Sequence, residues 1–401
     1  MLDPTLEAEG LGRSDFSEAL AADWSGRALE IADQLRGARV LVAGAAGTIG
    51  AAAVRQLLAL APAAIELVDV DENGLARLAR DIRSRGDGVG VALGFNALDF
   101  AGWPGLALAE ATGPFDLVLD FAAVKHVRSE KNLYTLLHML DVNVVRQRRF
   151  AAHLAERRLA RRLFVVSTDK AADPASFMGA SKLMMEAAVF DAAAGALPAS
   201  AARFANVAYS SGSLLESYLQ RFAAGQALAA PRDTRRYFIS ARDGARICLI
   251  AQLACPPGRV AIPRFEPASG AVELAETAAA FLRSRGRRAA FVETAEEAAA
   301  VLARGAADWP VLLTPRDTAG EKEIELFRGA GETVEPLGLA ALESIRPAPV
   351  DPAALHAALA DLAAFVSGQA PATAADIEAA LGAVLPGFRH AAGGASLDDR
   401  I

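Results

Sequence analysis

A hydroxyl, a carboxylate and an amine stand side by side in the middle of this sequence, at Thr168, Asp169 and Lys170. They follow the apolar run 163–166, which is typical of a buried parallel strand. Open α/β sheets bind ligands beyond the carboxyl ends of their strands, so these three groups are placed for acid–base chemistry. Ordinary surface charges on a strand-to-loop turn are the alternative interpretation.

A helix is predicted to begin at Met178 and to carry Lys182 one turn later on the same face. Methionine has no exchangeable proton, so we expect Met178 to shape the pocket. For Asp169 and Lys170 to act as acid and base near neutral pH, burial and neighbouring charges must move both pKa values toward neutrality.

A glycine-rich turn precedes these groups in the chain. A strand predicted at 39–43 runs into this turn, and a helix is predicted over 51–60. This order gives a GxxGxxG dinucleotide fingerprint, in which backbone amides and the helix dipole face a pyrophosphate. Glycines that only close a turn are the alternative. The expected cofactor contacts are Gly44, Ala46, Gly47, Thr48, Ile49 and Gly50.

The next predicted strand, 65–68, ends at Asp69, close to the spacing at which an acid binds the adenosine ribose hydroxyls. A carboxylate there repels a 2′-phosphate, and Val70 follows where an arginine could hold one. The sequence therefore favours NAD over NADP. Asp71 is a competing acid, which we predict to cap the helix that starts near Glu72.

Two further strands are predicted at 89–93 and 117–123. The first leads to a polar stretch that we expect at the edge of the adenine, although it could equally be a simple turn. The small residues of the second would let a cofactor lie against the backbone. The contacts expected from these two segments are Asn96, Ala97, Ala122 and Ala123.

Strands alternate with helices through residues 38–205, which predicts an α/β fold with a doubly wound parallel sheet. Beyond this range the pattern loosens toward a smaller α/β lobe, in which Arg235 and Arg236 beside Tyr237 suit a diphosphate or a stacked uracil. Four segments are expected: a helical leader (1–37), an NAD-binding Rossmann domain (38–205), a substrate-binding lobe partly interleaved with it (206–345) and a helical tail (346–401).

The composition argues against several classes of function. The 401 residues carry a net charge of −7 and no basic cluster interleaved with aromatic residues, so no nucleic-acid partner is expected. Two cysteines are too few for a disulfide framework, and the five histidines lack metal-ligand spacing, so no metal is expected. The acidic N-terminus lacks a signal-peptide pattern, and no apolar run approaches about 18 residues. We therefore expect a cytoplasmic protein without membrane spans.

Seven motifs between about residues 35 and 330 resemble the extended short-chain dehydrogenase/reductase superfamily. They are Gly44-x-x-Gly47-x-x-Gly50, 122–127, 167–171, 178–182, 203–207, 210–213 and 236–238. Within the superfamily, the Ser-Thr-Asp-Lys and Met-Gly-Ala-Ser-Lys pair is similar to nucleotide-sugar 4,6-dehydratases that act on UDP-N-acetylglucosamine in bacterial polysaccharide biosynthesis. Chain length and the segment beyond residue 330 resemble enzymes of legionaminic-acid pathways. The resemblance also implies a homo-oligomer.

The reaction implied by this resemblance uses tightly bound NAD⁺, which is regenerated in each cycle. Hydride leaves C4 of the hexose, water is eliminated across C5 and C6, and hydride returns to C6 to give a 4-keto-6-deoxy sugar. The implied roles are Asp169 as acid, Lys170 as base, Thr168 at the 4-hydroxyl and Lys182 at the nicotinamide ribose. The implied contacts to the UDP-sugar are Lys125, His126, Asn206, Ser213 and Arg236.

Two positions depart from the superfamily pattern. Met178 replaces the tyrosine of Tyr-x-x-x-Lys, which leaves open which group takes the 4-hydroxyl proton and favours retention of configuration at C5. Val124 stands where this branch usually has an aromatic residue. A UDP-sugar 4-epimerase is an alternative, but it normally depends on that tyrosine. A non-catalytic NAD-binding sensor is a second alternative, and it would need no acid–base pair such as Asp169 and Lys170.

Overall fold

The structure is a computed structural model that describes residues 15–265, 271–305, 307–315 and 322–390. Its centre is a nine-stranded sheet made of β1 (Arg39–Ala43), β2 (Ala64–Asp69), β3 (Ala92–Ala97), β4 (Leu117–Asp120), β5 (Leu163–Val166), β6 (Ala199–Ala202), β11 (Val260–Pro263), β15 (Thr333–Pro336) and β16 (Leu342–Arg346). The strand order is β15-β16-β11-β6-β5-β4-β1-β2-β3. The strands from β3 to β11 are parallel, and β16 and β15 are antiparallel. This confirms the predicted doubly wound sheet.

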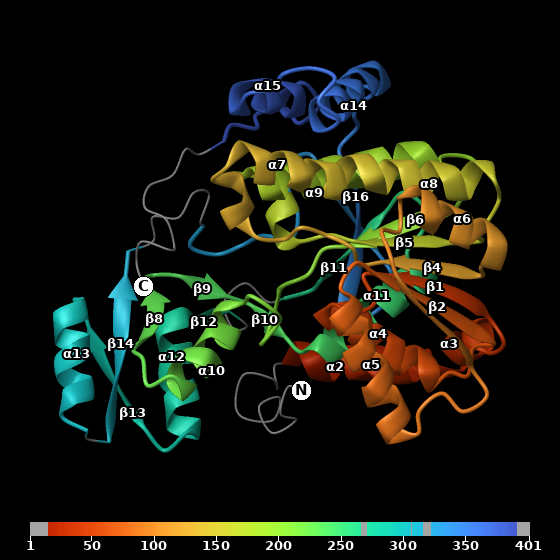
Figure 1. Ribbon diagram of the computed structural model, residues 1–401. Coiled ribbons are helices and arrows are strands. Elements are labelled where there is room, and N and C mark those ends of the chain that lie inside the picture. Colours follow the sequence, from red (N-terminus) through yellow and green to blue (C-terminus); the bar gives the residue numbers. More distant parts are fainter. Residues whose placement is uncertain (1–14, 266–270, 306, 316–321, 391–401) are drawn as a thin grey trace.

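Helices cover both faces of this sheet (Figure 1). One face carries α2 (Asp15–Gly26), α3 (Ala28–Leu35), α4 (Thr48–Leu58), α5 (Glu72–Arg85) and α11 (Ala241–Ala254). The other carries α6 (Trp103–Thr112), α7 (Leu133–Leu140), the π-helical segment η2 (Asp141–Arg146), α8 (Gln147–Glu156) and α9 (Phe177–Ala193). The helical stretch that leads into α8 therefore begins with a π-helical segment.

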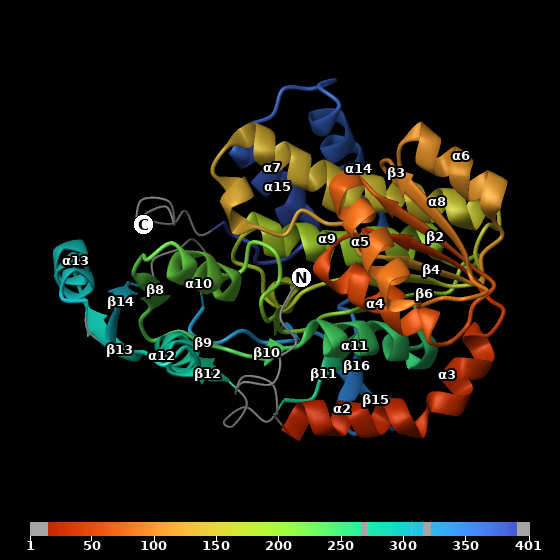
Figure 2. The same ribbon diagram turned by 60° about the horizontal axis from the view of Figure 1, so that its bottom comes forward.

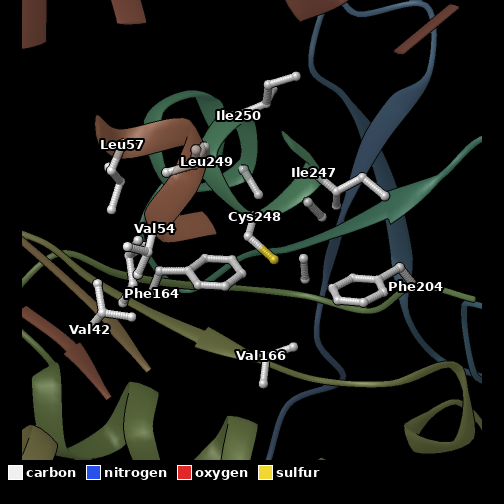
Figure 3. Packing of buried hydrophobic residues seen from close by; sticks show 14 of the residues in the cluster. Val42, Val54, Leu57, Phe164, Val166, Phe204, Ile247, Cys248, Leu249 and Ile250 are labelled. Carbon is white, nitrogen blue, oxygen red and sulfur yellow. The ribbon is translucent and has the colours of Figure 1, made fainter. Parts of the chain in front are cut away.

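The period-two pattern of each strand divides the core into two layers. In β1, Val40 and Val42 face α4 and α11, whereas Leu41 and Ala43 face α8 and α9. Figure 3 shows the first layer, where the fully buried thiol of Cys248 packs among aliphatic side chains. Both cysteines, Cys248 and Cys255, are free and buried.

A smaller lobe projects to one side of the main sheet (Figure 2). It contains a parallel sheet in the order β13-β14-β8 and three helices. These elements are β8 (Leu228–Pro231), β13 (Arg288–Val292), β14 (Asp308–Thr314), α10 (Leu214–Ala223), α12 (Leu274–Ser284) and α13 (Ala295–Ala303). Two short strand pairs join it to the sheet: β7 (Asn206–Val207) with β10 (Phe238–Ile239), and β9 (Arg235–Arg236) with β12 (Val272–Glu273). The chain returns to the main sheet at β11, β15 and β16.

The C-terminal helices α14 (Pro352–Val366) and α15 (Ala374–Val384) pack over α7 and α9 (Figure 1). Their buried leucines share one hydrophobic cluster with Met139, Phe177 and Met178. Residues 391–401 of the expected tail and 1–14 of the expected leader lie outside the described residues.

Two predicted strands had the wrong bounds, and one of them, expected at 117–123, ends at Asp120. The strand expected at 89–93 begins at Ala92, because Gly88 and Gly90 adopt positive φ in the turns that precede it. The 203–207 motif is not one strand: residues 203–205 follow β6 without regular structure, and only 206–207 form β7, which pairs with β10. The alanine-rich sequence of β6 has low strand propensity, and its burial between β5 and β11 outweighs that preference.

Candidate active site

The glycine turn after β1 is packed so closely that larger residues do not fit. Gly44 has a φ of +71°, and a Cβ there would lie 2.7 Å from the backbone nitrogen of Ala122. A Cβ on Gly50 would lie 2.1 Å from the carbonyl oxygen of Gly44. Both distances are below van der Waals contact, so the turn can lie against the end of β4 only with glycine at these positions. The N-terminus of α4 is thereby directed at the same strand end, as a dinucleotide-binding turn requires.

A cleft of about 950 Å³ opens beyond the carboxyl ends of β1, β2 and β4. Seven of the predicted cofactor residues line it: Gly44, Ala46, Gly47, Thr48, Asp69, Ala122 and Ala123. Its size, the glycine turn and the carboxylate of Asp69 fit a dinucleotide. Five other predicted cofactor residues do not line it, and one of them, Lys182, lies on α9. Ile49 packs against the hydrophobic core, Gly50 lies behind Gly44, Ala97 is exposed, and the amide of Asn96 donates to Glu66 at 2.9 Å.

Asp69 is fixed by two backbone amides. Its Oδ2 accepts from Ala46 and its Oδ1 from Asp71, each at 2.9 Å. These bonds join the glycine turn to the β2–α5 turn and orient the carboxylate at the wall of the cleft. The side chain of Asp71 instead accepts from the amide of Gly74 at 2.9 Å, which confirms that it caps α5.

The second half of the chain contributes cleft residues that were not predicted as site residues: Tyr209, Ser211 (within the 210–213 motif), Glu216, Ala241 and Arg242. The hydroxyl of Thr48 accepts from the amide of Ser211 at 3.3 Å, which ties this second half to the N-terminus of α4. Arg242 is the second residue of α11 and is exposed at the cleft wall. No local pattern marks it, because only the packing of α11 against α4 brings it there.

The three groups at the end of β5 form one hydrogen-bonded set. They lie at a 3₁₀ turn, Asp169–Ala171, where the Oδ1 of Asp169 accepts from the Thr168 hydroxyl at 2.8 Å and from the Lys170 ammonium at 3.0 Å. Glu325, which the sequence analysis missed, lies 3.8 Å from the same ammonium and is buried. The sequence offered no signal for Glu325, because it stands in an irregular segment far along the chain.

The charges around Lys170 act against the expectation of a pKa near neutrality. Burial alone would lower the pKa of the Lys170 ammonium, but the carboxylates of Asp169 and Glu325 raise it above its ordinary value. Burial also raises the pKa of Glu325, and the nearby Asp169 adds to this effect. The structure therefore corrects that prediction for Lys170, which is an ammonium at neutral pH in this arrangement.

Arg236 is the one predicted substrate residue that the fold brings beside this set. It is nearly buried and donates to the carbonyl oxygens of Lys322 and Glu323 at 2.9 and 3.1 Å, and its charge acts on both Lys170 and Glu325. Lys322 in turn donates to the backbone just after the turn that carries Asp169. The segment from 322 onward thus closes over the end of β5.

The remaining predicted substrate residues lie at other points around the loops. The Lys125 and His126 side chains are exposed, and a Cβ on Gly212 would meet the His126 ring at 2.5 Å, so this loop touches the 210–213 turn. The hydroxyl of Ser213 caps α10 by accepting from the Glu216 amide at 3.2 Å. The side-chain nitrogen Nδ2 of Asn206 donates to the carbonyl oxygen of Tyr237 at 3.5 Å.

Helix α9 places Met178 and Lys182 in the interior. Both are nearly buried, and neither lines the cleft. The amide of Met178 donates to Glu130 at 2.7 Å, and the other oxygen of Glu130 lies 3.0 Å from the His390 ring. That ring stacks on Phe177 with centroids 4.2 Å apart. The C-terminal tail therefore supports the start of the helix that carries Met178.

Asn143 fixes the backbone beside the expected aromatic position. Its side-chain oxygen accepts from the amide of Val124, and its nitrogen donates to the carbonyl of the same residue, both at 2.9 Å. The nitrogen also donates to Ser181 at 3.0 Å. The π-helical turn that contains Asn143 thereby connects the loop after β4 to α9.

Among the described residues, no group of histidine, cysteine, aspartate and glutamate side chains is arranged to hold a metal ion. Within the same ranges, every helix is too short or too polar to cross a lipid bilayer.

Curated relatives match a little over half of the chain. An uncharacterized membrane protein from Methanocaldococcus jannaschii is 27% identical over 228 residues, which is 56% of this chain and 65% of that protein. The probable polysaccharide biosynthesis protein EpsC from Bacillus subtilis is 24% identical over 230 residues, 55% of this chain and 37% of that protein. The chain thus spans less than two thirds of either relative.

Solved structures share the fold at low identity. Pen from Bacillus thuringiensis superposes with a TM-score of 0.63 at 17% identity, covering 79% of this chain and 89% of Pen. A UDP-N-acetylglucosamine 4-epimerase from Methanobrevibacter ruminantium, in complex with UDP-N-acetylmuramic acid, gives 0.55 at 13%, with 74% and 91% covered. WbmF from Bordetella bronchiseptica, in complex with NAD⁺ and UDP, gives 0.50 at 17%, with 61% and 76% covered.

One family model matches a region of the chain that includes the glycine turn, the cleft residues and the Thr168–Lys170 set. The family model of polysaccharide biosynthesis proteins matches residues 40–298, which is well over half of the chain. With its doubly wound sheet and dinucleotide cleft, this chain therefore belongs to the polysaccharide biosynthesis protein family.

Proposed function

We propose that the protein is an NAD-dependent UDP-N-acetylglucosamine 4,6-dehydratase that supplies a 4-keto-6-deoxy sugar for surface-glycan or nonulosonic acid biosynthesis. The observation that carries this proposal is the hydrogen-bonded set of Thr168, Asp169 and Lys170 at the end of β5. None of the three lines the dinucleotide-sized cleft, but β5 pairs with β4, whose following loop does. An elimination needs two proton carriers, one at each end of the bond that loses water. A simple oxidoreductase or a nucleotide sensor has no use for such a pair.

The cofactor proposal rests on the cleft. The N-terminus of α4 and the exposed guanidinium of Arg242 would hold the diphosphate, and Asp69 would accept from the adenosine ribose. NAD⁺ bound there supplies the oxidation that makes the neighbouring C5 proton acidic. WbmF, which shares this fold, was solved with NAD⁺ and UDP. Lys182 would approach the nicotinamide ribose from α9.

The roles at the end of β5 follow from the hydrogen bonds observed there. Thr168 would donate to the oxygen at C4, and Asp169 would give a proton to the departing 6-hydroxyl. Lys170 would take the C5 proton once its proton has been released. A sugar hydroxyl that binds Asp169 competes with the ammonium for the same carboxylate oxygen, and loss of that partner lowers the pKa of Lys170. Lys125, His126, Asn206, Ser213 and Arg236 would hold the UDP-sugar.

Met178 supports dehydration over the alternative of 4-epimerisation. It is buried at the start of α9 and cannot exchange a proton, so no tyrosine stands ready at this position to shuttle a proton at C4. The same absence favours retention of configuration at C5, because a second proton donor on the opposite face is missing.

The test is mass spectrometry of UDP-N-acetylglucosamine after incubation with the purified protein. Dehydration removes one water from the substrate, whereas a 4-epimerase leaves the mass unchanged and alters the proton NMR couplings at C4. Asp169→Asn and Lys170→Met are expected to abolish the loss of water while NAD stays bound. The matched control is Asp173→Asn, which makes the same chemical change at an exposed site four residues away. Unchanged substrate in the presence of bound NAD would overturn the proposal.

A further inference from the structure

A buried chain of polar side chains begins at the residue before Thr168. The hydroxyl of Ser167 donates to Oε1 of Glu186, which lies on α9. The guanidinium of Arg203, just after β6, donates to both oxygens of the same carboxylate, from Nε at 2.8 Å and from Nη2 at 2.6 Å. All three side chains are buried, and Arg203 is 0% exposed. These bonds connect the end of β5 to α9 and to Arg203.

The other side of the Arg203 guanidinium binds residues 322–332, which we call the strap. Nη1 donates to Oε2 of Glu332 at 2.7 Å and to the carbonyl oxygen of Phe327 at 3.3 Å, and Nη2 donates to Oε1 of Glu332 at 2.8 Å. Together with the two bonds to Glu186, these bonds use all five N–H groups of the guanidinium. Arg203 therefore bridges two carboxylates, one on α9 and one at the end of the strap.

The strap is bound near both of its ends. Its residues, all of which the structure describes, form no helix or strand, so individual contacts must fix its path. Arg236 binds the carbonyl oxygens of its first two residues, and Arg203 binds its last residue. Glu325 lies between these two contacts, with its Oε1 3.8 Å from the Lys170 ammonium. The position of Glu325 relative to Lys170 thus depends on both arginines.

Buried bridged charges are better suited to fixing a position than to stabilising a fold. Removing a guanidinium and two carboxylates from water is costly, and well-packed apolar residues often stabilise a protein as much or more. A planar guanidinium with every N–H group engaged, however, accepts only one arrangement of its partners. The bridge from Glu186 through Arg203 to Glu332 is therefore suited to define where the strap lies relative to α9.

We propose that Arg203 is a positioning residue for the acid–base set, which binds the strap against the end of β5 and keeps Glu325 beside the Lys170 ammonium. The proposal rests on the proposed function for the task of Lys170 as the base. None of the five bonds of Arg203 goes to Thr168, Asp169 or Lys170. Arg203 acts on this set through the strap.

The charges that face Lys170 make the position of the strap consequential. Burial lowers the pKa of the Lys170 ammonium, but Asp169 and Glu325 raise it above its ordinary value. The positive charge of Arg236 acts in the same direction as burial, and Lys322 faces Glu325 from the start of the strap. Asp169 stays on the same turn as Lys170 if the strap moves, whereas Glu325 moves away. Releasing the end of the strap should therefore lower the pKa of Lys170.

The test follows the Lys170 ammonium directly, in the NAD-bound protein without any sugar. The chain has five lysines, so isotope-labelled lysine gives an NMR spectrum with few side-chain signals, and Lys170→Met assigns the signal of interest. Glu332→Gln removes one carboxylate from Arg203 and leaves the neighbours of Lys170 unchanged. The midpoint of the Lys170 titration should move to lower pH by about one unit or more.

The matched control is Glu335→Gln. Glu335 lies three residues further along the chain and also bridges two arginines, at 2.6 Å each, but it belongs to β15 and not to the strap. The chemical change is the same and a bridged carboxylate is lost, so this variant is expected to keep the wild-type titration of Lys170.

A double-mutant comparison separates the position of the strap from the charge of Glu332. In a Glu325→Gln background, Glu332→Gln should cause no further shift, because the carboxylate that the strap carries to Lys170 is already gone. A direct effect of the lost Glu332 charge would be the same in both backgrounds. If Glu332→Gln does not fold, Arg203→Lys provides the second arm, since it keeps the cation but cannot bridge two carboxylates. The same shift, confined to the background that contains Glu325, is expected.

The outcomes for the two proposals are distinguishable. An unmoved Lys170 midpoint in Glu332→Gln overturns the positioning role whether or not stability falls, and so does an equal shift in both backgrounds. The titration needs no sugar, so it decides this role even if the wild-type protein does not dehydrate UDP-N-acetylglucosamine and the proposed function fails. If the protein does dehydrate it, the pH at which the rate rises should move together with the Lys170 midpoint.

Discussion

Replacing Glu325 by glutamine tests the most consequential contact that the fold adds to the site. Glu325 is 4% exposed, and its Oε1 lies 3.8 Å from the Lys170 ammonium. Opposite unit charges at this separation attract by roughly 4 kcal/mol at an effective dielectric constant of about 20, and such a neighbour moves a pKa by about 1–3 units. Glutamine keeps the shape and removes the charge. Glu325→Gln is therefore expected to lower the pKa of Lys170 by about 1–3 units.

The assay is the rate of water loss from UDP-N-acetylglucosamine as a function of pH. If Lys170 must be neutral to take the C5 proton, the wild-type rate rises as the pH passes through the pKa of Lys170. The Glu325→Gln profile should show the same rise at lower pH, and the variant should be faster on the acid side. Glu323→Gln is the matched control, because Glu323 is exposed in the same segment. A rise at the same pH in Glu325→Gln and wild type, with unchanged thermal stability, would refute the role of Lys170 as the base.

Three further substitutions test the framework around the site. Arg203→Met strips Glu186 of its buried guanidinium partner, so it should lower the free energy of unfolding in urea by about 3–5 kcal/mol; a loss below about 1 kcal/mol would show that the pair is not desolvated. Gly50→Ala drives a Cβ into the Gly44 carbonyl, and NAD affinity measured by calorimetry should fall at least about tenfold, the equivalent of one lost charge-assisted bond. His390→Ala removes the ring that contacts the Glu130 carboxylate, which in turn accepts from the amide of Met178 at the start of α9. We expect the free energy of unfolding to fall by about 1–3 kcal/mol, measured by thermal unfolding, and kcat to fall as well. An unchanged kcat in His390→Ala would show that the C-terminal tail does not influence catalysis.

Local patterns were sufficient for the parts of the protein that depend on neighbouring residues. The order of strand, glycine turn and helix predicted the turn at Gly44, because backbone conformation and close approach to β4 are both encoded by glycine itself. The acid at the end of the second strand and the cap at Asp71 followed from residue type and spacing. The alternation of strands and helices predicted the doubly wound sheet. Strand bounds failed at 89–93, where glycine turns delay the start of β3, and at 117–123, where β4 ends at Asp120.

Contacts between distant segments were decided by the tertiary structure alone. The sequence named Lys170 and described its chemistry, but one of the two carboxylates that raise its pKa comes from Glu325, and no spacing rule connects Glu325 to Lys170. The same holds for His390 beside Glu130, which are joined only by the fold. Protonation depends on which charges meet in a low-dielectric interior, and that meeting is set by the path of the whole chain. The sequence by itself therefore determined which groups could do chemistry, and the fold decided their charge states.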